Sequence, residues 1–228
     1  MKIVKWYIKG LFPIRFLIPF YIVILTFQFL IWYYYKESSI DLIININSLL
    51  LIPIFVINGA LHITRNKETT VLEISLLRSW KFVSIGRIFS IYIFSLTFGI
   101  VEFLLTYLLY SNLIISILII ITLLIYSSLS LLASLLHSST SILIVSTISF
   151  LFPIGFLTLI SSYSRLNLKL PIIIQIFSWI FAPNYSYSYY EEGVITLDPS
   201  LGIICDIIFS IISTISYYEL FRKLDFKI

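Results

Sequence analysis

Few side chains in this sequence of 228 residues are of types that could perform chemistry. It contains two histidines, His62 and His137, and one cysteine, Cys205. The histidines are too few and too far apart in the chain to indicate a metal centre, and a single cysteine cannot form an intramolecular disulfide. Neither histidine has a Gly-x-Ser-x-Gly turn to serve, and the pair Glu191 and Glu192 is followed by no residue at metal-ligand spacing. These patterns argue against an enzyme and predict no catalytic residue and no metal site on this chain.

Ionisable residues are concentrated instead in the segment 64–87, where they are interleaved with apolar ones. The candidate contact residues of this segment are Glu68, Thr70, Val71, Leu72, Glu73, Leu76, Leu77 and Arg78. Their order predicts an amphipathic helix of about three turns, capped near its start by Thr69 or Thr70. Such a helix either joins two membrane spans at the interface or presents a mixed apolar and charged face to a partner protein, and both interpretations remain open at this point.

Two further acidic residues fall within long apolar runs. Glu102 lies well inside the run 86–110, where an ionised group costs at least about 2.5 kcal/mol on insertion scales, so it should face other helices or a cavity. It is either a residue of a translocation path or dimer interface, or a neutral acid hydrogen-bonded to a neighbouring side chain. Asp206 lies nearer the start of the run 201–220, and we expect it to be a boundary group near the outer surface.

The composition identifies the class of protein. Apolar and aromatic residues make up 60% of the chain and charged residues only 11%, with a mean hydropathy of +1.05. Soluble domains carry about 25% charged residues, so lipid must solvate much of this apolar surface. The apolar runs are continuous rather than alternating, which favours spanning α-helices over a β-barrel. The sequence therefore predicts an all-α integral membrane protein with a single transmembrane domain over 1–228.

Six runs are long enough to cross a bilayer, since about 20 residues span the hydrocarbon. The predicted spans are 14–35, 42–64, 86–110, 113–136, 142–162 and 201–220. The segment 168–185, between the last two, is expected to form short re-entrant helices in the outer leaflet or an interfacial aromatic belt. It is followed by a tyrosine-rich stretch, and Asn184, Tyr185 and Ser186 form a glycosylation sequon.

The distribution of basic residues predicts the orientation. Of the 15 lysines and arginines, all but Lys36, Arg165 and Lys169 fall on one side if both termini are cytoplasmic. The chain is therefore expected in the cell membrane as a multi-pass protein.

The N-terminal residues predict a membrane-surface anchor. Lys2, Lys5 and Lys9 share one arc of a helical wheel, and Trp6 lies among the aromatic and apolar residues of the remainder. This pattern is typical of an amphipathic helix that lies in the headgroup plane of the lipid bilayer.

The string "NKETTVLEISLLRSWKFVSIGRI" resembles the first cytoplasmic loop of the type-2 ABC-transporter permeases. The matching residues are Glu68, Thr70, Leu72, Glu73, Leu76, Leu77, Trp80, Lys81, Gly86 and Arg87. Thr69 stands where the family has glycine, and its usual proline after the leucines is replaced near Trp80. The order of spans, the N-terminal helix and the basic C-terminus are also similar to this family.

The resemblance implies a permease subunit of an exporter. Such a subunit acts as a homodimer or as a heterodimer with a related permease. It implies that the segment 68–78 is a coupling helix that docks on a separate ATP-binding subunit. This chain has no G-x-x-x-x-G-K-[ST] loop, so ATP and Mg would be bound by the partner and no cofactor by this chain. No nucleic-acid partner is expected. The alternative is a membrane scaffold or regulatory subunit of a larger complex that transports nothing.

Overall fold

The computed structural model describes residues 14–36, 40–48, 67–77, 79–136 and 138–223, and all regular secondary structure within them is helical. The helices are α2 (Ile14–Tyr35), α3 (Ile40–Ile46), α5 (Lys67–Leu77), α6 (Trp80–Tyr110), α7 (Leu113–Ala133), α8 (Ser138–Ser146), the π-helix η3 (Thr147–Leu151), α9 (Phe152–Arg165), α10 (Ile172–Phe181), α11 (Pro183–Glu191) and α12 (Pro199–Lys223). The predicted all-α fold is confirmed for this part of the chain.

Five of these helical segments are long and apolar enough to cross a membrane. They are Ile18–Tyr35, Trp80–Tyr110, Leu113–Ala133, Leu143–Arg165 and Pro199–Lys223. They correspond to five of the six predicted spans, with ends that differ by a few residues. The remaining predicted span, 42–64, lies outside the described residues from residue 49 onward. These five helices are consistent with a multi-pass membrane protein.

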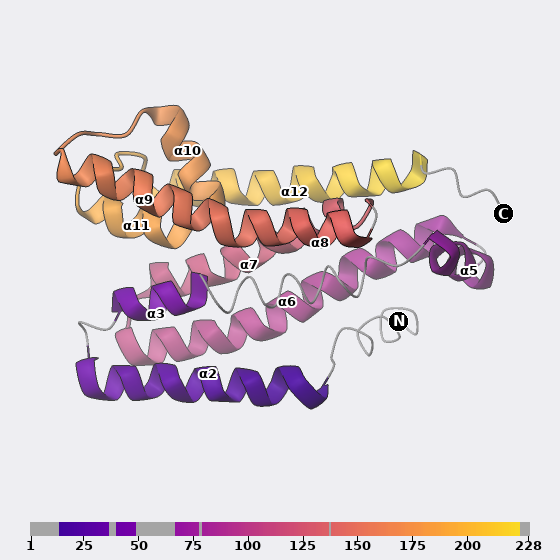
Figure 1. The fold of residues 1–228 in the computed structure, drawn as a ribbon, viewed down its shortest axis with the longest axis horizontal. Helices are drawn as coiled ribbons and strands as arrows, with labels where there is room; N and C mark the ends of the chain where they lie inside the picture. Colours follow the sequence, from indigo (N-terminus) through magenta and orange to yellow (C-terminus); the bar gives the residue numbers. More distant parts are fainter. Residues whose placement is uncertain (1–13, 37–39, 49–66, 78, 137, 224–228) are drawn as a thin grey trace.

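The long helices run side by side along one axis of the molecule (Figure 1). The start of α2, the helix α5 and the end of α12 lie at one end of this bundle, which we call the α5 end. The end of α2, the short helix α3 and the helices α10 and α11 lie toward the opposite end, the α10 end.

A tight turn at residues 110–112 connects α6 to α7. Ser111 adopts a left-handed conformation with φ 53°, and its amide donates to the carbonyl of Tyr107 at 2.8 Å. The side chain of Asn112 then caps α7 by accepting a hydrogen bond from the amide of Ile115 at 3.1 Å. These contacts satisfy backbone groups that a helix end leaves without intrahelical partners, so α6 and α7 can pack as antiparallel neighbours.

A π-helical turn interrupts the span formed by α8 and α9. The widened turn covers Thr147–Leu151 and is followed by Pro153 in the first turn of α9. Proline has no backbone N–H to donate and its ring crowds the preceding turn, which explains why the regular α-helical ladder opens here.

Among the long helices of the described chain, α7 is the most enclosed. Its serines Ser127, Ser128 and Ser130 are buried and donate to carbonyls of their own helix at 2.6 to 2.8 Å. The hydroxyl groups of Ser127 and Ser95 also meet across the α6–α7 contact. Small side chains let helices approach closely in lipid, and the internal hydrogen bonds leave these hydroxyls satisfied there.

The two short helices at the α10 end are fixed by polar and aromatic contacts. Gln175 donates to the carbonyl of Leu170 at 2.7 Å and accepts from the amides of Thr196 and Leu197 at 3.0 and 2.8 Å. Trp179 is fully buried against Gly202 of α12. Two short helices therefore lie between the last two of the five apolar spans, and their re-entrant placement in the outer leaflet stays a prediction.

The sequon at this end is not free for modification. The Asn184 side chain is buried in α11 and its amide donates to the hydroxyl of Ser48 at 3.2 Å. Glycosylation of Asn184 would require this contact to be broken in the folded chain.

Candidate functional site

The helix α5 lies against the beginning of α6 at the α5 end of the bundle (Figure 1). Its eleven residues contain no glycine or proline, so nothing in the sequence interrupts three turns of helix. One face is turned toward the spans, where Ile74 and Leu77 pack against a core cluster that includes Val83 and Tyr217. The opposite face carries Leu72 and Leu76, with 58% and 72% of their surfaces exposed.

A buried ion pair attaches α5 to the spans. A guanidinium nitrogen of Arg87 donates to the Glu73 carboxylate at 2.9 Å and to the Thr70 hydroxyl at 3.0 Å. The side chains of Arg87 and Glu73 are only 3% and 4% exposed. The same guanidinium lies 5.5 Å from the ring centre of Phe221, near the end of α12. Arg87 therefore connects α5, α6 and α12.

This geometry changes the roles expected of the candidate coupling residues. Glu73 and Thr70 face inward and anchor the helix, and Thr70 lies within α5, so the prediction that it caps the helix is wrong. Val71 and Leu77 are partly exposed, which leaves Leu72 and Leu76 as the outward apolar pair. The side chain of Glu68 and the whole of Arg78 lie outside the described residues.

In the sequence, Arg87 is one of the residues that match the permease loop, and its ion pair was not predicted. Its ion pair depends on the angle between α5 and α6, which no periodic signal reveals.

Glu102 lies in a polar cluster on the inner side of α6. It is 2% exposed, as the prediction that it faces other helices requires. Its polar neighbours are Tyr21 and Gln28 of α2 and Asn47 after α3, and Gln28 donates to Asn47 at 2.6 Å. The carboxylate itself makes no hydrogen bond of ordinary geometry within the described chain. Helices of the same chain cover Glu102, so a second copy is not needed to bury it.

The depth of Asp206 in the membrane, expected to be near the outer surface, stays a prediction. Asp206 is fully buried and lines a groove of about 370 Å³ between α6, α7 and α12. This burial was not predicted, since it depends on the packing of α7 and α10 against α12.

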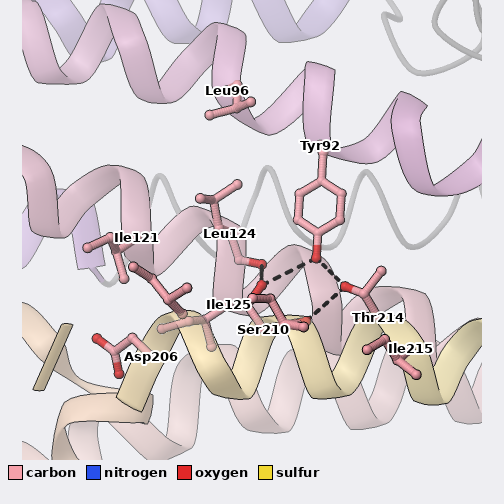
Figure 2. Close-up of a pocket in the computed structure, with 11 residues that line it drawn as sticks. Tyr92, Leu96, Ile121, Leu124, Ile125, Asp206, Ser210, Thr214 and Ile215 are labelled. Atoms are coloured by element: carbon pink, nitrogen blue, oxygen red, sulfur yellow. Dashed lines mark hydrogen bonds between the residues drawn. The ribbon is translucent and has the colours of Figure 1, made fainter. Parts of the chain in front are cut away.

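Figure 2 shows the groove with Asp206 toward one end and a group of hydroxyls toward the other. The Tyr92 hydroxyl lies 3.3 Å from the Ser210 hydroxyl and contacts that of Thr214. Thr214 in turn donates to the carbonyl of Ser210 at 2.8 Å. These bonds join α6 to α12 and close this end of the groove. The polar residues of this part of α12 are spaced by four, at Asp206, Ser210 and Thr214. Residues at this spacing lie on one face of a helix, so the stripe can be recognised in the sequence.

The remaining walls of the groove are apolar. They are formed by Leu96, Ile121, Leu124, Ile125, Ile207, Ile211 and Ile215. Within the described residues no three histidine, cysteine, aspartate or glutamate side chains lie close enough to hold a metal ion. The groove can therefore accept an apolar ligand, and Asp206 is the charged group in its wall.

The predicted membrane-surface anchor, Lys2, Lys5, Trp6 and Lys9, lies outside the described residues.

Comparisons with models of protein families, with curated proteins and with solved structures found no match to this chain.

Proposed function

We propose that this chain is the membrane permease subunit of an ATP-binding-cassette transporter, driven by a separate ATPase that docks on α5. The observation that carries the proposal is the two-sided construction of α5. Its inner face is held to the spans by the Glu73–Arg87 ion pair, and its outer face presents Leu72 and Leu76. An exposed apolar pair on an otherwise anchored helix is suited to a protein partner.

The anchoring explains how movement of a partner could reach the spans. Breaking a buried ion pair leaves an unpaired charge and costs about 3–5 kcal/mol, so α5 resists being detached when it is displaced. Because Arg87 also lies over Phe221, a displacement of α5 is passed to α12 as well as to α6. Such rigid-body coupling is a common means of switching between inward- and outward-facing states.

The other parts of the proposal come from the resemblance of the 67–88 sequence to type-2 permeases. The subunit acts as an exporter and pairs with a second copy or a related permease. ATP and Mg are bound by the ATPase, and the α5 end, with both chain termini, faces the cytoplasm of the cell membrane. The basic residues Arg222 and Lys223 at the end of α12 suit that side.

Purification of the tagged chain from its host in mild detergent, with mass spectrometry of co-eluting proteins, tests the proposal. We expect a stoichiometric ATP-binding subunit with the wild-type chain and its loss from the variant Leu72→Asp/Leu76→Asp. The matched control is Leu166→Asp/Leu168→Asp, which charges two exposed leucines at the α10 end and should retain the subunit.

Two outcomes would overturn the proposal. Wild-type chain that elutes without an ATP-binding subunit would indicate the alternative, a scaffold or regulatory subunit. Equal loss from both double variants would show that α5 is not the docking site.

A further inference from the structure

Asp206 differs from the other buried acids of the described chain because no described residue provides it with a polar partner. Glu73 is paired with Arg87, and Glu102 has three polar neighbours. Neither carboxylate oxygen of Asp206 has a hydrogen-bond partner among the described residues. An ionised group in the membrane interior costs about 2.5–3.5 kcal/mol, so this aspartate does not stabilise the fold in its charged form.

The groove beside Asp206 opens toward lipid. Ile207, Ile211 and Ile215 line it from α12 and are each about half exposed. They follow one another at intervals of four residues after Asp206, so they form an apolar stripe along one side of α12. The volume of about 370 Å³ is within the usual range of small-molecule sites.

We propose that this groove binds an amphiphile with a protonated amine, whose ammonium group pairs with Asp206 and whose hydrocarbon chain lies along the isoleucine stripe. The inference rests on the proposed function and names the substrate class of that permease. A cation supplies the charge that the buried carboxylate lacks, and the apolar walls supply the remaining contacts. The hydroxyls of Tyr92, Ser210 and Thr214 already bond to one another, so they mark the end of the apolar part.

Entry of the ligand requires a local opening. Asp206 is 0% exposed and lies beneath the groove surface. The ammonium group therefore reaches the carboxylate only when the side chains that cover it move aside. An amphiphile dissolved in the bilayer approaches from the side of the groove that opens toward lipid.

A second copy of the chain fits the groove less well. A two-fold contact centred here would set groove against groove, and the lining residues include no lysine, arginine or histidine. The copy would therefore leave both aspartates without a cation.

The test is equilibrium binding of tritiated dodecylamine to the full chain in phosphatidylcholine nanodiscs, with binding to empty nanodiscs subtracted. We expect saturable binding that Asp206→Asn weakens at least about tenfold. Asp198→Asn is the matched control, because it removes an exposed acid just before the same helix and asparagine also caps helices. Dodecanol, which has the same chain and no charge, should compete poorly.

A second variant, Ile211→Trp, fills the groove without changing Asp206 and should also abolish binding, so the test stands even if Asp206→Asn does not fold. Dodecylamine binding that survives in both variants, or equal competition by dodecanol, would overturn the inference. The assay needs no ATPase. If an ATPase co-purifies but the amine does not bind, this inference alone is contradicted. If the amine binds but no ATPase co-purifies, only the proposed function is contradicted.

Discussion

At the residue scale, Arg87 and Asp206 show two different outcomes for a charge inside the bundle. Arg87 is surrounded by Glu73, Thr70 and an aromatic ring, so its guanidinium is compensated within the fold. Asp206 is equally buried but lacks such partners. A compensated charge of this kind holds elements in place, whereas an uncompensated one is available to a ligand.

The ion pair leads to a stability prediction. Glu73→Ala leaves the Arg87 guanidinium buried without its carboxylate and should lower the free energy of unfolding by about 3–5 kcal/mol. The paired variant Glu73→Leu/Arg87→Met replaces both charges with apolar groups and should recover most of that loss. Thermal unfolding in nanodiscs measures both, and an unchanged midpoint for Glu73→Ala would show that the pair does not anchor α5.

The contact between Gly202 and Trp179 leads to a second stability prediction. A Cβ at Gly202 would lie 2.3 Å from Cδ2 of the Trp179 ring, so Gly202→Ala should destabilise the chain by about 1–3 kcal/mol. Gly155→Ala is the control, since a Cβ there meets nothing within 4 Å and alanine favours the helix. Equal unfolding midpoints for the two variants would mean that α12 can shift away from the tryptophan.

At the element scale, the helices that do not cross the bundle combine apolar packing with a few specific polar contacts. The helix α5 depends on one ion pair and a small apolar cluster. The helix α10 depends on Gln175, whose side-chain oxygen accepts hydrogen bonds from the amides of Thr196 and Leu197. Such elements can be loosened by single substitutions, whereas the long spans have many redundant contacts.

The Gln175 contact gives a local prediction. Gln175→Leu removes the acceptor of the Thr196 and Leu197 amides, and each unpaired group costs about 1–3 kcal/mol. Hydrogen exchange of a peptide covering these amides should accelerate while exchange in α6 and α7 is unchanged. Ser164→Ala, which removes an exposed hydrogen bond to Glu192 at the same end, should have little effect on that peptide. Equal acceleration in both variants would argue against the anchoring role.

At the scale of the whole molecule, the bundle has two chemically different ends. The α5 end has the outward leucine pair and the basic end of α12, and the α10 end has the tyrosine-rich helix α11 and Gln175. Asp198, just before α12, binds the amide and hydroxyl of Ser200, which hold the pKa of its carboxyl below the usual range. The two ends would face different sides of the membrane.

Cysteine labelling of intact cells tests this topology. In a Cys205→Ser background, we expect cysteines at Ser75 and Lys223 to be protected from an impermeant maleimide and one at Glu191 to be labelled. All three positions are exposed, at the α5 end for the first two and at the α10 end for the third. If only one of the cysteines at Ser75 and Lys223 were labelled, the two positions would not lie on the same side of the membrane. If both were labelled and the cysteine at Glu191 were protected, the orientation would be the reverse of the predicted one.

The helical spans could be predicted from the sequence because lipid imposes a simple requirement. Each crossing needs about 20 continuous apolar residues with internal hydrogen bonds, so α2, α6, α7, α9 and α12 are legible without knowledge of their neighbours. The turn at Ser111 and Asn112 and the short length of α10 are local properties of the same kind. Glu102 was correctly expected to face other helices because a lipid-facing acid is costly.

The partners of the buried charges were decided by tertiary structure. Glu73 and Thr70 looked like surface residues of an amphipathic helix, and only the packing of α5 on α6 turned them toward Arg87. The burial of Asp206 likewise depends on α7 and α10, which pack against α12. Hydropathy reports whether a residue can lie in lipid, but which helix covers it depends on rotations and contacts between segments distant in the chain. For that reason the spans follow from local sequence, whereas the anchored helix and the groove follow from the fold.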